Sequence, residues 1–174
     1  MIEDAGVTKT TFYKHFEGKD DFVLACVETR DAWELQSWDR AVKKIAGDDP
    51  AAQLLAFFDV LDLWFNDPDF RGCMFMNTAA EFSDRRDPIH RAAAAHWRKC
   101  RDQFRSLAGR AGAPDPDVFA DHFTILLQGT LVLRHVHDRN DAASVVRPAV
   151  VALVNQHIPQ HARRGKTTTP QASL

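Results

Sequence analysis

The side chains best suited to binding a polyanion lie together near the start of this sequence, in the segment AGVTKTTFYKHFEGKDDF, residues 5–22. From Thr8 to Lys19 this segment carries three lysines against one glutamate, although the whole chain has a formal net charge of −2. Short hydroxyl side chains pair with base edges or phosphates, and Tyr, His and Lys donate hydrogen bonds to phosphate oxygens. The residue types therefore indicate contact with nucleic acid through a local patch, and not through a basic composition.

Two helices joined by a tight turn are needed to present these side chains. Residues 2–5 resemble the end of a helix, and Gly6 suits the left-handed backbone that stops one. Thr8 is a good N-cap for a second helix over residues 9–15. This order predicts a helix-turn-helix unit, which places its second helix in the major groove of DNA.

The helical period divides residues 9–15 into an outward and an inward face. The outward face and its flanks comprise Lys9, Thr10, Thr11, Tyr13 and Lys14. Phe12 and Phe16 are four residues apart and point toward the core. Lys19 opens the next helix, whose N-terminal amides also attract phosphate. The alternative interpretation is a surface helix whose Lys and Thr side chains contact only solvent.

The composition and the cysteine content are those of an ordinary soluble protein. Apolar residues make up 45% and charged residues 26% of the 174 residues, which is enough chain to bury a core without disulfides. The three cysteines are widely spaced and form no zinc-ligand pattern. No signal segment and no apolar stretch long enough to cross a membrane is present. We therefore expect a cytoplasmic protein with no membrane partner.

Apolar residues recur at spacings of three and four between Asp-Pro and Gly breakers, so the predicted fold class is all-α. Helices are expected over residues 19–46, 50–65, 73–82, 88–108, 116–137 and 141–157. Asp49-Pro50 and Asp115-Pro116 supply an N-cap followed by Pro at the first helical position, and Asp141 is a third candidate cap. Pro148 must kink the last helix or mark its true start. Residues 159–174 are polar and are expected to be disordered.

Aromatic and Met side chains are abundant between residues 57 and 123 and admit two interpretations. The first is a packed core, which suits most of them. The second is a cavity for an apolar small molecule, in which a few polar groups such as His96, His122 or Gln128 fix the ligand. The residues predicted to line this pocket are Phe57, Leu61, Trp64, Met74, Asn77, Trp97, Phe104, Phe123 and Leu127.

The last two expected helices carry more apolar surface than one chain is expected to cover. A homodimer interface made of both helices is therefore predicted, with Gly129 permitting close approach of the backbones. Its predicted residues are Phe119, Phe123, Ile125, Gly129, Leu133, Val146, Val150 and Val154. Burial of these residues within one chain is the competing interpretation.

Histidine spacing does not favour a metal site. His135 and His137 are two residues apart and diverge on a helix, and the six-residue separation of His90 and His96 is also poor for shared coordination. No nucleophile–base set and no Gly-rich phosphate loop is evident. The sequence therefore predicts no metal, no cofactor and no enzymatic activity.

The segment over residues 5–22 resembles the signature of the TetR family of transcriptional repressors. That signature reads Ala-Gly-Val-Ser/Thr, then Thr, Tyr, His, Phe and Lys at fixed spacing across the turn, the recognition helix and the start of the following helix. The matching positions are Thr8, Thr11, Tyr13, His15, Phe16, Lys19 and Phe22. RGCMFMNTAAEF, residues 71–82, is similar to a stretch found in one branch of the family.

The resemblance implies a truncated helix-turn-helix DNA-binding segment followed by a TetR-type helical ligand-binding and dimerisation domain. The implied divisions are residues 1–18 (partial helix-turn-helix), 19–47 (linking helix), 48–158 (ligand binding and dimerisation) and 159–174 (tail). By the family's pattern, the residues at the major groove are Lys9, Thr10, Thr11 and Tyr13. Those bound to phosphates are Thr8, Lys14, His15 and Lys19.

The implied function is sequence-specific repression by a homodimer on a pseudopalindromic DNA operator, with release by an unknown apolar small molecule. Ligand binding would act through the helix over residues 19–46 on the separation of the two recognition helices. Family members have a first helix and most of a second before this segment, so a chain that begins at Met1 is expected to bind DNA weakly. The alternative is a helical ligand-binding or dimerisation module without DNA-binding activity.

Overall fold

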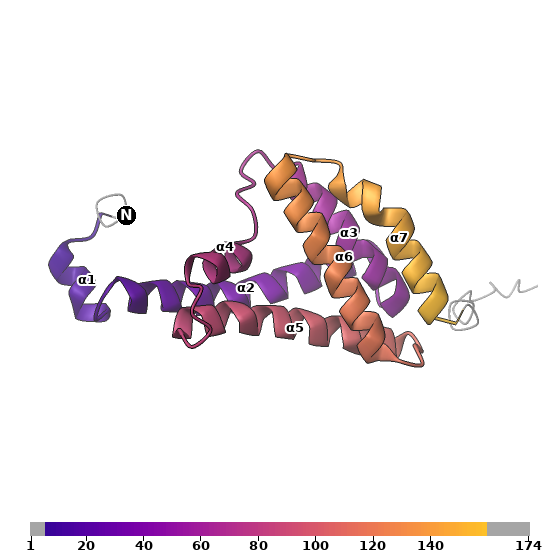
Figure 1. Ribbon diagram of the computed structural model, residues 1–174, viewed down its shortest axis with the longest axis horizontal. Helices are drawn as coiled ribbons and strands as arrows, with labels where there is room; N and C mark the ends of the chain where they lie inside the picture. Colours follow the sequence, from indigo (N-terminus) through magenta and orange to yellow (C-terminus); the bar gives the residue numbers. More distant parts are fainter. Residues whose placement is uncertain (1–5, 160–174) are drawn as a thin grey trace, which may run out of the picture. The chain divides into compact units, whose positions relative to one another are not determined.

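Seven α-helices form the part of the chain that the structure describes, residues 6–159 of a computed structural model (Figure 1). In chain order they are α1 (Lys9–His15), α2 (Lys19–Ala46), α3 (Pro50–Phe65), α4 (Met74–Glu81), α5 (Pro88–Arg110), α6 (Pro116–His137) and α7 (Ala142–His157). No residue in this described range lies in a β-strand, so the predicted all-α class is confirmed. None of the described helices is long and apolar enough to span a membrane.

The Asp-Pro pairs begin helices as predicted. The Asp49 carboxylate accepts hydrogen bonds from the backbone N–H groups of Ala51 at 2.9 Å and Ala52 at 3.3 Å. The Asp115 carboxylate accepts one from the N–H of Val118 at 3.1 Å. Each carboxylate satisfies donors that the first turn of a helix leaves without an intrahelical partner. These starts are therefore encoded locally.

The last helix has its expected extent but lacks the expected side-chain cap. α7 runs from Ala142 through Pro148, so this proline lies inside the helix and does not mark its start. The Asp141 side chain makes no capping hydrogen bond. Its two oxygens instead accept hydrogen bonds from Arg139 at 2.7 and 2.8 Å, because the guanidinium offers a bidentate charged partner.

The chain forms two compact units, and both α2 and α5 contribute to each. The first unit comprises residues 1–37 and 73–98, and the second comprises residues 38–72 and 99–174. These units group residues by contact and not by role, so the four functional divisions expected from the sequence stay a prediction. The helix end expected at residues 2–5 and all of the expected tail beyond Pro159 lie outside the described residues.

Phenylalanine rings hold the second unit together. The ring of Phe123, on α6, lies 4.7 Å from Phe104 of α5 and 5.4 Å from Phe58 of α3, measured between centroids. Phe57 of α3 lies 5.0 Å from Phe104 in an edge-to-face contact. All four side chains are buried. Because each such pair contributes about 0.5–1.5 kcal/mol beyond area burial, this cluster fixes three helices against one another.

α7 lies beside both α3 and α6 within the second unit (Figure 1). Its inward face buries Val150 and Val154 completely. At the edge of the contact with α3, Arg147 donates a hydrogen bond to the carboxylate of Asp59. The outward faces of α6 and α7 remain uncovered within one chain.

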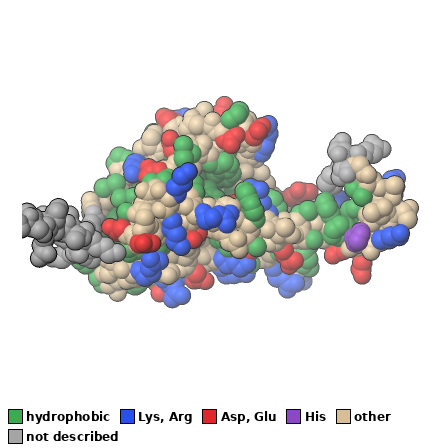
Figure 2. All heavy atoms as spheres, turned by 180° about the vertical axis from the view of Figure 1, so that it is seen from behind, with side chains coloured by type: hydrophobic (Ala, Val, Ile, Leu, Met, Phe, Trp, Pro, Cys, Tyr) green, Lys and Arg blue, Asp and Glu red, His purple; other side chains and the backbone are tan. Residues whose placement is uncertain are grey.

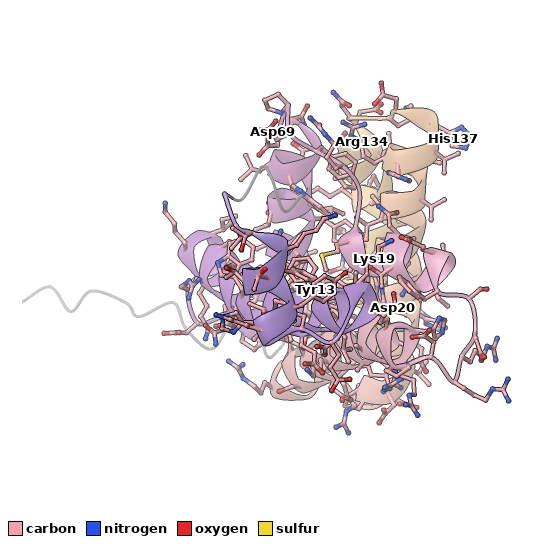
Figure 3. The ribbon with its side chains drawn as sticks, turned by 90° about the vertical axis from the view of Figure 1, so that its left-hand side faces the viewer. Tyr13, Lys19, Asp20, Asp69, Arg134 and His137 are labelled. Carbon is pink, nitrogen blue, oxygen red and sulfur yellow. The ribbon has the colours of Figure 1, made fainter. Side chains whose placement is uncertain are left out.

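Arg134, near the end of α6, binds the connection between α3 and α4 (Figure 3). Its Nε donates a hydrogen bond to the backbone carbonyl of Phe65 at 3.0 Å, and its guanidinium lies 4.4 Å from the centroid of the Phe70 ring. The same side chain pairs with Asp138, whose φ of 54° is the left-handed conformation in which α6 ends. Only 11% of the Arg134 side chain is exposed, whereas its partner Asp138 is 92% exposed.

We expect Arg134→Ala to lower the free energy of unfolding by about 2–4 kcal/mol. The substitution removes a charged hydrogen bond worth roughly 1.5–3 kcal/mol and a cation–π contact worth roughly 0.5–2 kcal/mol. Urea denaturation measures the change. Arg139→Ala is the matched control, because it also removes an arginine–aspartate pair, but on the exposed surface. Equal losses in both variants would contradict the role given to Arg134.

Candidate functional site

Thr8 begins the helix that carries the candidate DNA contacts. Its hydroxyl oxygen accepts a hydrogen bond from the backbone N–H of Thr11 at 3.1 Å and lies 2.9 Å from the Thr11 hydroxyl. Its backbone is extended, as an N-cap requires. The predicted cap is therefore confirmed, and the Thr8 side chain has a structural role within α1.

Three phenylalanine rings pack together where α1 meets α2, on the inner side of α1. The Phe12 ring lies 5.3 Å from Phe16 and 5.5 Å from Phe22, and Phe16 lies 5.0 Å from Phe22. Phe22 belongs to α2, so this cluster joins α1 to the first turn and a half of the long helix. The inward direction predicted for Phe12 and Phe16 is confirmed, and each ring is half-buried.

The opposite face of α1 is open to solvent. Tyr13 is 63% exposed, and the other exposed candidates are Lys9, Thr10, Lys14, His15 and Lys19. Figure 3 looks onto this region and labels Tyr13 on α1 with Lys19 and Asp20 at the start of α2. Exposure on one face is what contact with a duplex requires, whereas contact itself remains a prediction.

The positive charge near α1 is local. The acidic first turn of α2 follows directly, and Asp21 accepts a hydrogen bond from the backbone N–H of Glu17 at 3.1 Å. Figure 2 shows Lys, Arg, Asp and Glu side chains mixed over the face that it draws. A polyanion would therefore be held by individually placed donors more than by a broad positive field.

Four of the predicted pocket residues form the ring-filled core of the second unit. Phe57, Leu61, Phe104 and Phe123 are all buried, and the three rings touch one another. Leu127, another predicted pocket residue, is also buried. The Trp64 side chain is half-buried and packs against Phe65 and Phe70. Packing is the role that these side chains have in this structure.

The remaining pocket candidates belong to the first unit. Met74 and Trp97 are half-buried, and Asn77 is exposed on α4. The predicted pocket residues thus divide between the two units. The pocket stays a prediction.

Two threonines of α6 have buried hydroxyl groups, and only one of the two has a hydrogen-bond partner among the described residues. Thr130 donates a hydrogen bond to the backbone carbonyl of Leu126 at 2.6 Å, the usual solution for a hydroxyl inside a helix. The Thr124 hydroxyl oxygen is also buried, but it has no hydrogen-bond partner among the described residues. Since buried polar atoms are almost always paired in folded proteins, this atom requires an explanation.

A carboxylate–imidazole pair is buried in the first unit. Asp31 of α2 and Nδ1 of His96 of α5 are 2.8 Å apart, and only 5% and 10% of the His96 and Asp31 side chains are exposed. The Phe75 ring of α4 stacks on the imidazole at 3.5 Å between centroids. His96 was a candidate polar group, but nothing in the sequence indicates Asp31, because the two residues are 65 positions apart.

Cys73, just before α4, is a buried thiol in the same unit. Burial raises its pKa to about 11, so it carries no thiolate at neutral pH and is a poor nucleophile there. Within residues 6–159, no three His, Cys, Asp or Glu side chains come together as a metal site.

The predicted dimer residues divide into two groups. Phe119, Phe123, Val150 and Val154 are buried within one chain, so they offer no surface to a second copy. This burial agrees with the competing interpretation for these four residues. On α6, Phe123 packs on Phe58 of α3 and Phe104 of α5, and Phe119 lies against His157 of α7. The exposed members are Ile125, Gly129 and Leu133, and Val146 is half-buried.

A shallow groove separates the outward faces of α6 and α7, with a volume of about 410 Å³. Its walls are His122, Ile125, Leu126, Ala149, Ala152, Leu153 and Gln156. No acidic or basic side chain other than the histidine lines it. Sequence reasoning missed Ala149, Ala152 and Gln156, since small and polar residues do not stand out in a hydrophobicity pattern.

A known family model matches more than half of this chain. Residues 50–150 match a family model described as the C-terminal domain of tetracycline repressor-like proteins. The chain matches none of the curated proteins with which it was compared.

Several solved structures are similar over most of the chain. SCO4454, a TetR-family transcriptional regulator from Streptomyces coelicolor, is 27% identical, with a TM-score of 0.78 over 90% of this chain and 82% of that one. A protein described as a TetR transcriptional regulator from Streptomyces avermitilis is also 27% identical, with a TM-score of 0.75 over 90% and 84%. A regulator from Cytophaga hutchinsonii, 17% identical, shares the fold with a TM-score of 0.77 over 91% and 82%.

We expect Thr124→Val to raise the free energy of unfolding by about 1 kcal/mol, because it removes a buried hydroxyl that has no partner within residues 6–159. Thr130→Val, on the same helix, should instead lower it by about 1 kcal/mol, because a hydrogen bond is lost. Urea denaturation of both variants gives the comparison. A loss of similar size in both would show that the Thr124 hydroxyl has a partner in solution.

Proposed function

The chain belongs to the TetR family of transcriptional regulators, and we propose that it binds DNA through α1 as a homodimer and releases that DNA when a small apolar effector binds. The observation that carries the proposal is the combination of the family match over residues 50–150 with the exposed polar face of α1. A repressor is the simplest regulator of this design, because bound protein blocks transcription until the effector removes it.

α1 is built to present donors to a duplex. The Thr8 cap and the Phe12, Phe16 and Phe22 cluster hold its backbone without using Lys9, Thr10 or Tyr13. Short hydroxyls let the helix approach base edges, and we place Lys9, Thr10, Thr11 and Tyr13 at the major groove. We place Thr8, Lys14, His15 and Lys19 at phosphates, although the Thr8 hydroxyl must then share its capping role.

The outward face of α6 has the spacing of a helix-packing surface. Its exposed residues recur at alternating steps of four and three: Val118, His122, Ile125, Gly129, Val132 and Val136. The matching exposed residues on α7 are Val145, Ala149, Ala152 and Gln156. We call these ten residues the outer stripe. It contains no Asp, Glu, Lys or Arg, and a second copy covering it would complete a four-helix bundle.

Small residues at the middle of the outer stripe favour close packing. A Cβ atom built on Gly129 meets no other atom within 4 Å, so the backbone there is accessible to a partner helix. Ala149 and Ala152 lie across the groove from Ile125, which is 66% exposed in one chain. Burying such side chains contributes roughly 25 cal/mol per Å² of apolar surface. A dimer of this kind would carry two copies of α1 to two half-sites of an operator.

We place an effector contact at Thr124. Its buried hydroxyl lacks a partner among the described residues, and the adjacent core is rich in aromatic rings. A ligand that is mostly apolar and has one hydrogen-bonding group fits such surroundings. The effector would act on α2, whose first turn carries Phe22 and hence α1, and so change the separation of the two recognition helices.

Lys19→Ala is expected to flatten the dependence of DNA affinity on salt. Losing one phosphate contact lowers the slope of log affinity against log salt by about one unit, whichever duplex is used. The measurement is fluorescence anisotropy with duplexes from the region upstream of the gene, at several salt concentrations. Lys44→Ala is the control, because it removes the same charge from an exposed position near the other end of α2. An unchanged slope in Lys19→Ala would remove this residue from the phosphate contacts.

Ile125→Glu is expected to convert the dimer into a monomer. The substitution puts a charge at the centre of an apolar interface, and burying that charge without a partner costs far more than the contact contributes. Light scattering coupled to size exclusion measures the mass. Leu63→Glu is the control, since Leu63 is 70% exposed on α3 and lies outside the outer stripe. If both variants stay dimeric, the interface lies elsewhere.

A further inference from the structure

Two imidazole rings, one on α6 and one on α7, lie close together beside the outer stripe. The rings of His122 and His157 are 5.9 Å apart between centroids, at 73° to each other. The Phe119 ring of α6 also lies 5.9 Å from the His157 ring. His122 is exposed in one chain, whereas His157 is half-buried. The pair therefore stands at the edge of the buried core and at the start of the proposed interface.

One carboxylate beside His122, that of Asp121, interacts with it electrostatically but is engaged mainly by an arginine. The other walls of its groove are the apolar or amide side chains already described. The nearest carboxylate on α6 is Asp121, and it accepts a hydrogen bond from Nε of Arg101 of α5 at 2.5 Å. That contact with Arg101 holds the pKa of Asp121 below its usual range. On the α7 side, the neighbouring titratable group is His157 itself.

We infer that the His122–His157 pair makes dimerisation sensitive to pH, so that protonation of these imidazoles separates the two copies. The inference rests on the outer stripe being the dimer interface, as proposed above. It adds a regulation that the apolar stripe alone would not have. Each separated chain would carry only one α1 and would lose the gain in DNA affinity that comes from binding two half-sites at once.

The physical reason is the difference in hydration between the two states. In the free chain, His122 is exposed, so water solvates its charged form. In the dimer, the same ring lies against the outer stripe of the second copy, where burial makes its charged form unfavourable, and Arg101 already holds the one carboxylate beside it. His157, 5.9 Å away, adds repulsion when both rings are charged. The dimer therefore binds fewer protons than two free chains.

The sign of the effect follows from this proton count. Because the free chains take up protons on separation, association is strongest above the titration range of imidazole and weakens as pH falls through about 7 to 5. Linkage gives a change of up to about tenfold in the dissociation constant per pH unit for each proton taken up. With one His122 in each copy, we expect the constant to rise about 10- to 100-fold between pH 7.5 and pH 5.5.

Sedimentation equilibrium of the full chain at pH 7.5, 6.5 and 5.5 tests the inference, with circular dichroism to follow helix content at each pH. His122→Gln replaces the imidazole with a polar group that never becomes charged, and it should stay dimeric at pH 5.5. His137→Gln is the matched control, because this exposed histidine is on α6 but outside the outer stripe. The control should keep the pH dependence of the unmodified chain.

Each outcome decides between the two proposals. A dimer of equal strength at all three pH values overturns the inference and leaves the proposed dimer intact. A monomer at every pH overturns both. A pH dependence that His122→Gln does not reduce also overturns the inference, including the case in which both chains lose helix content equally at pH 5.5.

Discussion

The ring of Phe123 fixes the rotation of α6 about its own axis, and the arrangement of the second unit follows from that constraint. Phe58 of α3 and Phe104 of α5 hold this ring, so the α6 face with Phe119 and Phe123 must turn inward. Because a helix is rigid, the residues on its opposite side must then turn outward together. The outer stripe is thus a geometric consequence of the aromatic core. Its apolar character is nevertheless not required by that core, which is why a second copy is the partner that we propose for it.

α1 depends on a different and more local set of contacts. One hydroxyl caps the helix, and two rings on its inner side meet Phe22 of α2. These contacts leave every charged side chain of α1 free to point into solvent. A DNA-reading surface needs this separation, because a side chain that supports the helix is not available to hold a phosphate. Thr8 is the exception, since its hydroxyl already serves the cap.

Buried polar side chains have hydrogen-bond or ionic partners, with one exception among the described residues. Arg134 is nearly buried and satisfied by a carbonyl, a ring and a carboxylate, and Asp31 with His96 forms a close buried pair. Burying such groups costs several kcal/mol unless they are paired, so each pair fixes the helices that contribute it. The Thr124 hydroxyl departs from this rule, and for that reason it is the most informative polar atom in the second unit. This is the reason why we propose an effector contact at Thr124.

The sequence by itself determined the helices and the face of α1, because caps, breakers and a seven-residue amphipathic pattern act over short distances. Asp49, Asp115, Thr8 and Gly47 all work within a few residues of their own positions. Tertiary structure alone decided which side of α6 is inside. α6 carries large apolar residues on both sides, so its hydrophobicity pattern has no preferred direction, and the same is true of α7. Phe119, Phe123, Val150 and Val154, which were predicted at a dimer surface, are buried within one chain. The pairing of Asp31 with His96 was equally out of reach, since only folding brings together residues 65 positions apart.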